Sequence, residues 1–320
     1  MQAPPFVAWM FPVGMMVLGA GFACGQDYPN KPIRFVTAAP GGGVDFTARM
    51  VAQGLTGSLG QQVVVDNRGG TSIAEQTVAK APPDGYTILV HNNTVWTLPL
   101  LQKAPYDPGK ELLPITLATR SPNILVVHPS LPVNSVKELI ALAKASPGAI
   151  NYAAGVIGAS NHLAAELFKA MAGVNLPRIG YKGGGPALND LISGQVQVMF
   201  ATTGSVTPHV KSGRLRALAV TSAEPSALAP GLPTIAASGV PGYESVTLYG
   251  LFAPAKTPAT IINRLNRETV RFLNMPDTKE RFFNSGVETV GSSSQEFATA
   301  IRTDTARLVK VIKDAGLRVE

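Results

Sequence analysis

The chain has 320 residues, with 27 lysines and arginines against 20 aspartates and glutamates, a net charge of +7. At roughly 150 residues per domain this length predicts two domains or one large α/β unit. A content of 45% hydrophobic and 15% charged residues excludes a disordered chain. One cysteine excludes a disulfide framework, and four scattered histidines lack metal-ligand spacing, so we expect no metal and no cofactor. Without a basic run the positive charge does not predict nucleic-acid binding, but it suits attraction of small anions into a cleft.

The first 25 residues are expected to lie outside the fold. No charged side chain precedes Asp27, and residues 6–25 form an apolar run that ends in small residues. This pattern predicts a cleaved secretory signal over residues 1–25 and an exported mature protein, although the usual positive start is missing. The alternatives are a retained membrane anchor, because the run is just long enough to span a membrane, and a lipid-modified Cys24, which the preceding Phe22 disfavours.

Strand, loop and helix alternate through the first third of the chain. Apolar runs with β-branched residues predict strands at 33–39, 63–65 and 86–90. Helical spacing predicts a helix from Phe46 to Leu59, and the Ser72–Glu75 pair has the spacing of a capping box that opens a second helix. This β-α-β-α-β order predicts a mainly parallel sheet with helices on both faces.

The middle of the chain repeats the alternation. Short strands are predicted at 125–127, 151–154, 196–200 and 215–220, and a second capping-box pair, Ser135 and Glu138, opens a helix. A last strand at 248–252 precedes helices over most of 258–316. With crossings placed near 118–127 and 221–247, we expect two lobes. The first comprises residues 26–120 and 223–320, and the second comprises residues 121–222.

Three glycine-rich turns each lie between a strand and a helix, at 41–43, 155–160 and 183–185. The first amide N–H groups of a helix have no partner within it, and the helix dipole places partial positive charge there. In open α/β sheets such turns lie at the carboxyl ends of the strands, where ligands bind. Any one turn is explained as well by the chain reversal that it makes. The three together predict a site for an anion.

Known phosphate and hydrolase motifs are incomplete in this chain. Phe46 stands where a P-loop and a dinucleotide-binding turn each require glycine, and Gly158–His162 approximates GxSxG but ends in histidine. Ser160 and His162 would point apart on a helix, so we interpret Ser160 as an N-cap or a ligand donor and His162 as a structural hydrogen-bonding residue.

Other polar residues near the turns leave two interpretations open. Asp45 is either a dipole partner or a ligand contact, and Asn92, Asn93 and Thr94 are either loop residues or cleft donors. Lys182 is either a solvated surface charge or a partner of a carboxylate.

Eleven segments, spread in order over nearly all of the chain after residue 27, match the pattern of one family: Tyr28–Arg34, Ala39–Gly43, Val63–Arg68, Pro83–Thr87, Pro105–Pro108, Glu138–Lys144, His162–Phe168, Tyr181–Gly184, Gly194–Val196, Leu215–Val220 and Pro241–Glu244. In these segments the chain resembles the receptors of tripartite tricarboxylate transporters, the Bug family of extracytoplasmic solute-binding proteins.

The resemblance implies a two-lobed α/β fold of the type II periplasmic-binding-protein kind, each lobe a mainly parallel sheet flanked by helices. It implies a monomeric, non-enzymatic receptor that closes on a small organic acid, such as a di- or tricarboxylate or an aromatic acid. The partners would be the membrane permease subunits of the transporter. By position, one carboxylate would be held by Gly41, Gly42, Gly43, Val44, Asp45, Gly158, Ala159 and Ser160. The rest of the ligand would meet Asn92, Asn93, Thr94, Lys182, Gly183, Gly184 and Thr202.

Two departures from the family pattern lie where the far end of a ligand is expected. Ala201-Thr202-Thr203 follows Met199-Phe200 where relatives often have aspartate, and the loop between Arg68 and Ile73 is about two residues short. Loss of the acidic group disfavours a ligand that bears an amino group. The alternative functions are an α/β hydrolase or nucleotide-using enzyme with degenerate motifs, and a ligand sensor for a membrane signalling protein.

Overall fold

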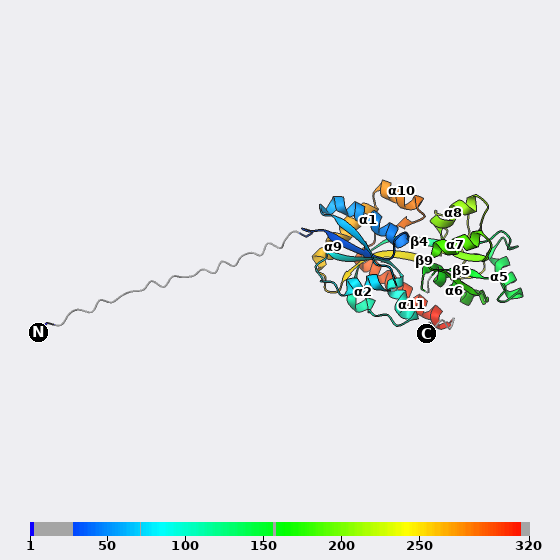
Figure 1. The fold of residues 1–320 in the computed structure, drawn as a ribbon, viewed down its shortest axis with the longest axis horizontal. Helices are drawn as coiled ribbons and strands as arrows, with labels where there is room; N and C mark the ends of the chain where they lie inside the picture. The colour runs from blue at the N-terminus through cyan, green and yellow to red at the C-terminus, as the bar shows by residue number, and fades with distance from the viewer. Residues whose placement is uncertain (3–27, 71, 156–157, 315–320) are drawn as a thin grey trace.

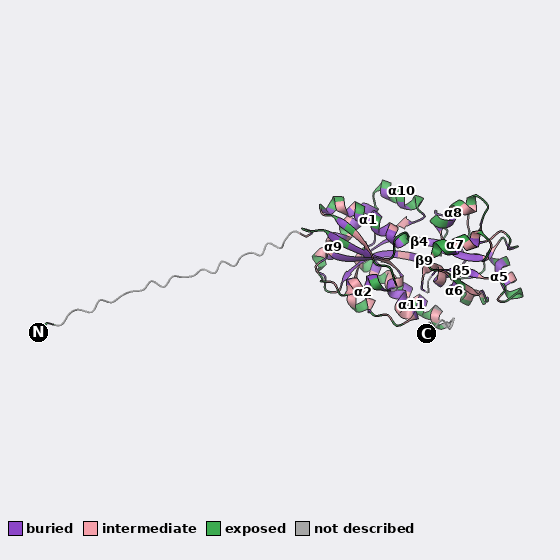
Figure 2. Cartoon of the chain, viewed as in Figure 1, coloured by how far each residue is buried: buried purple, intermediate pink, exposed green. Residues whose placement is uncertain are grey.

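The computed structural model describes residues 1–2, 28–70, 72–155 and 158–314, and those from residue 28 on form two lobes lying side by side (Figure 1). The expected two-lobed α/β fold is confirmed, but one mixed sheet runs through both lobes in place of a mainly parallel sheet in each. The predicted signal segment, residues 1–25, falls outside the described residues apart from its first two positions. Buried strands run through the middle of both lobes, whereas the helices expose their outer faces (Figure 2).

The first lobe is built on the strand order β2-β1-β3-β9-β4, in which β1, β2 and β3 are parallel and β9 and β4 are antiparallel to their neighbours. Its strands are β1 (Ile33–Thr37), β2 (Val63–Asn67), β3 (Thr87–Asn92), the first part of β4 (Leu112–Val127), β9 (Val246–Pro254) and β10 (Glu288–Thr289). Its helices are α1 (Gly43–Leu59), α2 (Ile73–Ala79), α3 (Thr94–Leu101), α4 (Pro108–Glu111), α9 (Ala259–Leu273), α10 (Pro276–Asn284) and α11 (Ser294–Asp314).

The second lobe continues the sheet in the order β4-β7-β5-β6, with β8 also paired to β4. Its further strands are β5 (Tyr152–Ala154), β6 (Arg178–Gly180), β7 (Val198–Thr202) and β8 (Arg216–Val220). Its helices are α5 (Val136–Ala145), α6 (Ser160–Ala172), α7 (Gly184–Ile192) and α8 (Thr203–Lys211).

Each lobe has a hydrophobic core on both faces of its sheet. In the first lobe, Leu55 of α1 packs with Leu265 of α9 on one face, and Trp96 of α3 packs with Phe297 of α11 on the other. In the second lobe α5 and α6 cover one face, and α7 and α8 cover the other. This double coverage explains why the strands read as continuous apolar runs rather than as alternating ones.

β4 is the strand that joins the two lobes, and it is far longer than the expected 125–127. Residues up to Pro122 pair with β9 in the first lobe, and Asn123 to Val127 pair with β7 in the second. Pro114 argued against a strand in the sequence because proline has no N–H group to donate to the hydrogen bonds of a sheet. The structure accommodates it with a register shift between Pro114 and Thr116.

The return to the first lobe comes later in the chain than the expected boundary at 222/223. Ile235, Val240 and Tyr243 pack in the second-lobe core with Phe168, and the Tyr243 hydroxyl donates to the Ala164 carbonyl at 2.9 Å. The segment that looked like a connection in the sequence therefore belongs by its packing to the second lobe, and the crossing back lies at the start of β9.

The two predicted capping boxes have different outcomes. The Ser135 hydroxyl accepts the Glu138 N–H at 3.2 Å, as predicted for α5. The capping interpretation of Ser72 is wrong, because Ser72 has a positive φ of 63° and its side chain makes no cap bond to α2. α3 and α8 were not predicted as helices, since each contains an internal proline, Pro99 and Pro208.

Candidate ligand-binding site

The strand register brings the carboxyl ends of strands from both lobes together. Asn92, the last residue of β3, lies opposite Tyr249 of β9, and Tyr249 lies opposite Thr119 of β4. Thr202, the last residue of β7, lies opposite Asn123, four residues further along β4. Both lobes therefore direct their βα turns to one short stretch of the strands that join them, the location where open α/β sheets bind ligands.

In the described chain, six helices begin at the carboxyl ends of parallel strands, namely α1, α2 and α3 in the first lobe and α6, α7 and α8 in the second. None of their N-cap residues makes a side-chain capping bond; these residues are Gly42, Ser72, Asn93, Ala159, Gly183 and Thr202. In α3 the Asn92 side chain accepts the Thr94 N–H, but in the other helices first-turn N–H groups are left for another acceptor. Each helix adds positive potential. This arrangement suits an anion held between the lobes.

Asp45 holds the glycine turn of the first lobe in place. Its buried carboxylate accepts the Gly41 N–H at 3.0 Å, the Arg49 Nε at 3.1 Å and the Asn67 Nδ2 at 2.8 Å. Burial acts to raise the pKa of Asp45, but these three hydrogen bonds outweigh burial and hold the pKa below its usual value. An ionised Asp45 therefore fixes the turn from beneath, while Gly41, Gly42 and Gly43 remain exposed and Val44 is buried.

Tyr249 lies directly against the same turn. A Cβ placed on Gly43 would lie 2.6 Å from the Tyr249 hydroxyl oxygen, so only glycine permits this approach. Burial raises the pKa of Tyr249 to about 12. Tyr249 therefore presents a neutral phenol at the start of α1.

Asn92 and Thr94 form a hydrogen-bonded corner at the start of α3. The Asn92 side-chain carbonyl accepts from the Thr94 N–H at 3.1 Å and from the Thr94 hydroxyl at 2.6 Å. Asn93 lies between them, buried at the N-cap position. Asn92 and Thr94 thus shape the corner, and Asn93 is the member of the group that lines a pocket between the lobes.

The Gly158–Ser160 turn of the second lobe contacts the first lobe. A Cβ on Gly158 would lie 3.8 Å from Leu98 of α3. The His162 Nδ1 accepts the Gly158 N–H at 3.2 Å, and burial lowers the pKa of His162 to about 4, so the ring is neutral near pH 7. The structural interpretation of His162 is confirmed. Ser160 is the first residue of α6 rather than its N-cap, which is Ala159.

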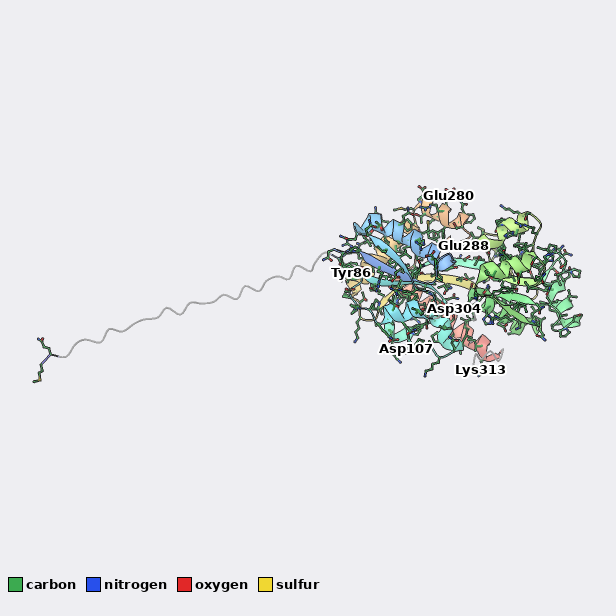
Figure 3. All side chains as sticks on the ribbon, viewed as in Figure 1. Tyr86, Asp107, Glu280, Glu288, Asp304 and Lys313 are labelled. Carbon is green, nitrogen blue, oxygen red and sulfur yellow. The ribbon has the colours of Figure 1, made fainter. Side chains whose placement is uncertain are left out.

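Asn93 and Ser160, predicted from opposite lobes, line one pocket. Arg307 of α11 closes one side of it, donating to the Asp304 carboxylate and to Glu244 at the start of the return crossing. Asp304 lies near the junction of the lobes (Figure 3). The pocket is lined by Asn93, Ser160, Leu163, Leu167, Glu244, Ser245, Val246, Asp304, Arg307 and Leu308.

Other predicted site residues are not part of this pocket. Lys182 is exposed, and Gly183 and Gly184 face open space at the start of α7. Thr202 hydrogen-bonds the Ser205 hydroxyl at 3.0 Å, and its strand neighbour is Asn123. These residues lie at the same strand ends, but none of the hydrogen bonds described above joins them to Asn93 or Ser160.

Two buried polar residues on the joining strands were missed by the sequence analysis. Asn123 is fully buried, and among the described residues neither its side-chain oxygen nor its nitrogen has a hydrogen-bond partner. The Thr247 hydroxyl is also buried and unpartnered there, opposite Ser121 in the β4–β9 register. In the sequence these residues are marked by a polar side chain within an otherwise apolar strand. Burying such a group without a hydrogen bond costs free energy.

Neither a metal site nor a membrane span is found in the described residues. No group of three or more histidine, cysteine, aspartate and glutamate side chains is placed there to hold a metal ion. No helix among the same residues combines the length and apolar character needed to cross a membrane.

Comparison with known proteins identifies the family. A family model described as the tripartite tricarboxylate transporter family receptor matches residues 47–317. Protein BugT from Bordetella pertussis is 33% identical over 317 residues, covering 96% of this chain and 97% of BugT. The structure of R. palustris Rpa4515 with adipate is similar with a TM-score of 0.83 and 37% identity, over 91% of this chain and 99% of Rpa4515.

MatC from Rhodopseudomonas palustris, solved with bound malate, is similar with a TM-score of 0.80 and 26% identity, over 89% of this chain and all of MatC. The similarity covers both lobes and the strands that join them. The chain therefore belongs to the tripartite tricarboxylate transporter receptor family, as its resemblance to these receptors predicted.

Proposed function

We propose that this chain is a monomeric periplasmic receptor that closes its lobes on a small organic carboxylate and delivers it to the permease subunits of a tripartite tricarboxylate transporter. The observation that carries the proposal is the set of helix N-termini that both lobes direct to one stretch of β4 and β9. The family is one of receptors rather than of enzymes. Two similar structures hold dicarboxylates, adipate and malate.

One carboxylate would be held from both sides. The Gly41–Gly43 turn, braced by Asp45, would offer N–H groups from the first lobe. The Gly158–Ser160 turn and the Ser160 hydroxyl would bind the same group from the second lobe, with Asn93 beside them. Because these donors come from different lobes, a bound anion has more contacts in the closed state and stabilises it.

The rest of the ligand would lie toward Thr202, Lys182 and the Gly183–Gly184 turn, over Asn123 and Thr247. A buried amide that lacks partners is expected to gain them when a ligand or an ordered water enters. Asn123 has one acceptor and one donor group, so it would suit a ligand group that both donates and accepts, such as a hydroxyl.

A thermal-shift screen of residues 26–320 tests the proposal. The panel contains adipate, malate, aliphatic tricarboxylates, aromatic acids and amino acids. A ligand at 100 times its dissociation constant adds about 2.7 kcal/mol of stability, or roughly 5 °C for a protein of this size. Stronger shifts with amino acids than with the matching plain acids would contradict the expectation drawn from Ala201-Thr202-Thr203.

Ser160→Ala is the matched test of the clamp. We expect at least tenfold weaker binding of the best acid, about 1.4 kcal/mol. Ser130→Ala, which removes an exposed hydroxyl bonded to His128, should leave affinity unchanged. A folded wild-type protein that binds no acid in the panel but turns over esters or nucleotides would replace the receptor proposal with the enzyme alternative.

The periplasmic location and the transport partner need separate tests. We expect the protein isolated from the periplasm to have lost its first 25 or so residues, measured as its intact mass. We expect loss of the matching permease to abolish uptake of the bound acid. Uptake that persists without the permease, together with altered gene expression, would favour the sensor alternative.

A further inference from the structure

A buried carboxylate and an imidazole lie beneath the Asn92–Thr94 corner. The His91 Nε2 is 3.7 Å from the Glu75 Oε1, and the His91 Nδ1 is 3.0 Å from the Thr94 hydroxyl and 3.1 Å from the Asn92 side-chain carbonyl. Glu75 comes from α2 with a side chain 3% exposed, and His91 from β3 with a side chain 11% exposed. The imidazole therefore connects a buried acid to the corner at the start of α3.

The hydrogen bonds of the corner restrict where the protons of this group lie. The Thr94 hydroxyl has one hydrogen, and its bond to the Asn92 carbonyl oxygen is the shortest of its contacts, at 2.6 Å. The Thr94 oxygen is then free to accept, an arrangement that is satisfied when the His91 Nδ1 donates. With Nδ1 protonated, a bare Nε2 would face the Glu75 carboxylate oxygen at 3.7 Å, and a second proton on Nε2 makes this contact an ion pair.

A neutral His91 without that second proton satisfies only part of this arrangement. If its hydrogen moves to Nε2, the bare Nδ1 faces the Asn92 carbonyl oxygen at 3.1 Å, and the two acceptors compete for the single Thr94 hydroxyl hydrogen. If its hydrogen stays on Nδ1, an unpaired negative charge remains buried on Glu75. Either change weakens the corner or adds negative potential beneath a site for an anion.

We infer that Glu75 and His91 are positioning residues that set the Asn92–Thr94 corner through a protonated imidazole paired with the Glu75 carboxylate, and that they make carboxylate binding pH-dependent. The inference rests on the proposed function, since the corner is one of the sites proposed to meet the ligand. Binding is tightest while the proton is present. As pH rises and the proton leaves, affinity falls.

The other titratable groups around this pair already have hydrogen-bond or ion-pair partners. Tyr106 donates its hydroxyl to the Val95 carbonyl at 2.9 Å, and burial, with a smaller effect of the Glu75 charge, raises its pKa well above the usual range. Asp304 on α11 is held by Arg307 and by the Trp96 indole N–H. On β9 the residue opposite His91 is Gly250, which does not titrate.

Proton positions are tested first on the ligand-free protein, by ¹⁵N spectra of histidine-labelled chain with the His91 signals assigned from His91→Gln. We expect a protonated Nδ1 near pH 7, and a loss of the second proton at higher pH that Glu75→Gln shifts. A neutral ring at pH 7 with a bare Nδ1 would overturn the inference whatever the protein binds.

Calorimetric titration of adipate at about pH 6 and about pH 8.5 tests the consequence for binding. We expect the wild type to bind about fivefold or more tightly at the lower pH. Glu75→Gln, which keeps the shape of the side chain, and His91→Gln should reduce that ratio to less than about twofold. His128→Gln, which alters a histidine at the far end of β4, should keep the wild-type ratio and reports any effect of ligand protonation.

The outcomes separate this inference from the proposed function. If the wild type binds adipate and both variants retain its pH ratio, the positioning role is wrong while the receptor function stands. If the wild type binds no carboxylate, the proposed function fails, and the ¹⁵N spectra alone decide the proton arrangement.

Discussion

Gly204 and Gly286 touch backbone to backbone across the two lobes. A Cβ placed on Gly286 would lie 2.4 Å from the Gly204 nitrogen, and a Cβ on Gly204 would lie 2.5 Å from the Ser285 carbonyl oxygen. Gly204 is in the first turn of α8 in the second lobe, and Gly286 follows α10 in the first. These two helices lie on the same side of the molecule, one on each lobe (Figure 1). Beside this contact the Ser121 hydroxyl donates to the Gly286 carbonyl at 2.8 Å.

Gly286→Ala should destabilise the protein more than a glycine substitution that causes only backbone strain. Gly291 provides the matched control, because its φ of 69° is close to the 76° of Gly286 while its nearest neighbour atom is at 3.6 Å. We expect Gly286→Ala to cost about 1–3 kcal/mol more than Gly291→Ala in urea unfolding, the usual cost of overpacking. If the two substitutions lower the free energy of unfolding equally, the lobes can move apart at this contact without a loss of stability.

Gly43→Ala should weaken carboxylate binding by about tenfold, because the new methyl group must displace Tyr249 or the turn. Gly57→Ala is the control, since Gly57 lies further along α1, away from the turn, and a Cβ there has nothing within 4 Å. Affinities of both variants for the best acid are compared by calorimetry. Tyr249→Phe in the Gly43→Ala background removes the oxygen that lies closest and should restore part of the affinity. No recovery would indicate that the loss comes from the turn itself.

Asp45→Asn should destabilise the protein near pH 7 by about 1–2 kcal/mol, because a neutral amide accepts more weakly from Arg49 and from the Gly41 N–H. The pKa of Asp45 is lowered in the folded protein, so its stabilisation is present above the ordinary carboxyl pKa and is lost as pH falls through the folded value. The gap between wild type and variant, measured by unfolding at several pH values, should therefore shrink below about pH 4.

The control for this comparison is Asp277→Asn, which alters an exposed carboxylate in the first turn of α10. It should change stability by less than about 0.5 kcal/mol. A gap for Asp45→Asn that persists unchanged at pH 3 would show that charge on Asp45 is not what holds the turn.

Asn123→Leu should separate stability from binding. Replacing an unpartnered buried amide by an apolar side chain of similar size removes a desolvation penalty of about 1–3 kcal/mol, so the melting temperature should stay the same or rise. If the amide meets the ligand as proposed, affinity for a hydroxyl-bearing acid such as malate should fall by about tenfold. A stable variant with wild-type affinity would remove Asn123 from the site.

The division of the chain between its lobes shows how much of the fold can be predicted from local sequence patterns. The strands and helices of the first β-α-β-α-β unit follow from hydrophobic spacing and from turn residues, and so does the end of α1 at Gly60. By contrast, the long β4 strand is interrupted in the sequence by Pro114 and Pro122, and only its pairing with β9 makes it continuous. Local patterns also failed to predict α3 and α8, because each contains a proline. These prolines are tolerated because tertiary packing outweighs their low helix propensity.

The sequence by itself determined which turns are proposed to carry the site, since each of them places glycine or polar residues between a strand and the start of a helix. Only the tertiary structure decided which turns meet. The register of β4 with β7 and β9 brings Thr202 and Asn92 to one stretch of strand, and packing places Asn93 and Ser160 around one pocket. Asn123, Thr247 and the Glu75–His91 pair were hidden for the same reason. Whether a side chain is buried, and whether it has a hydrogen-bond partner, depends on residues far away in the chain. A local sequence pattern does not contain this information.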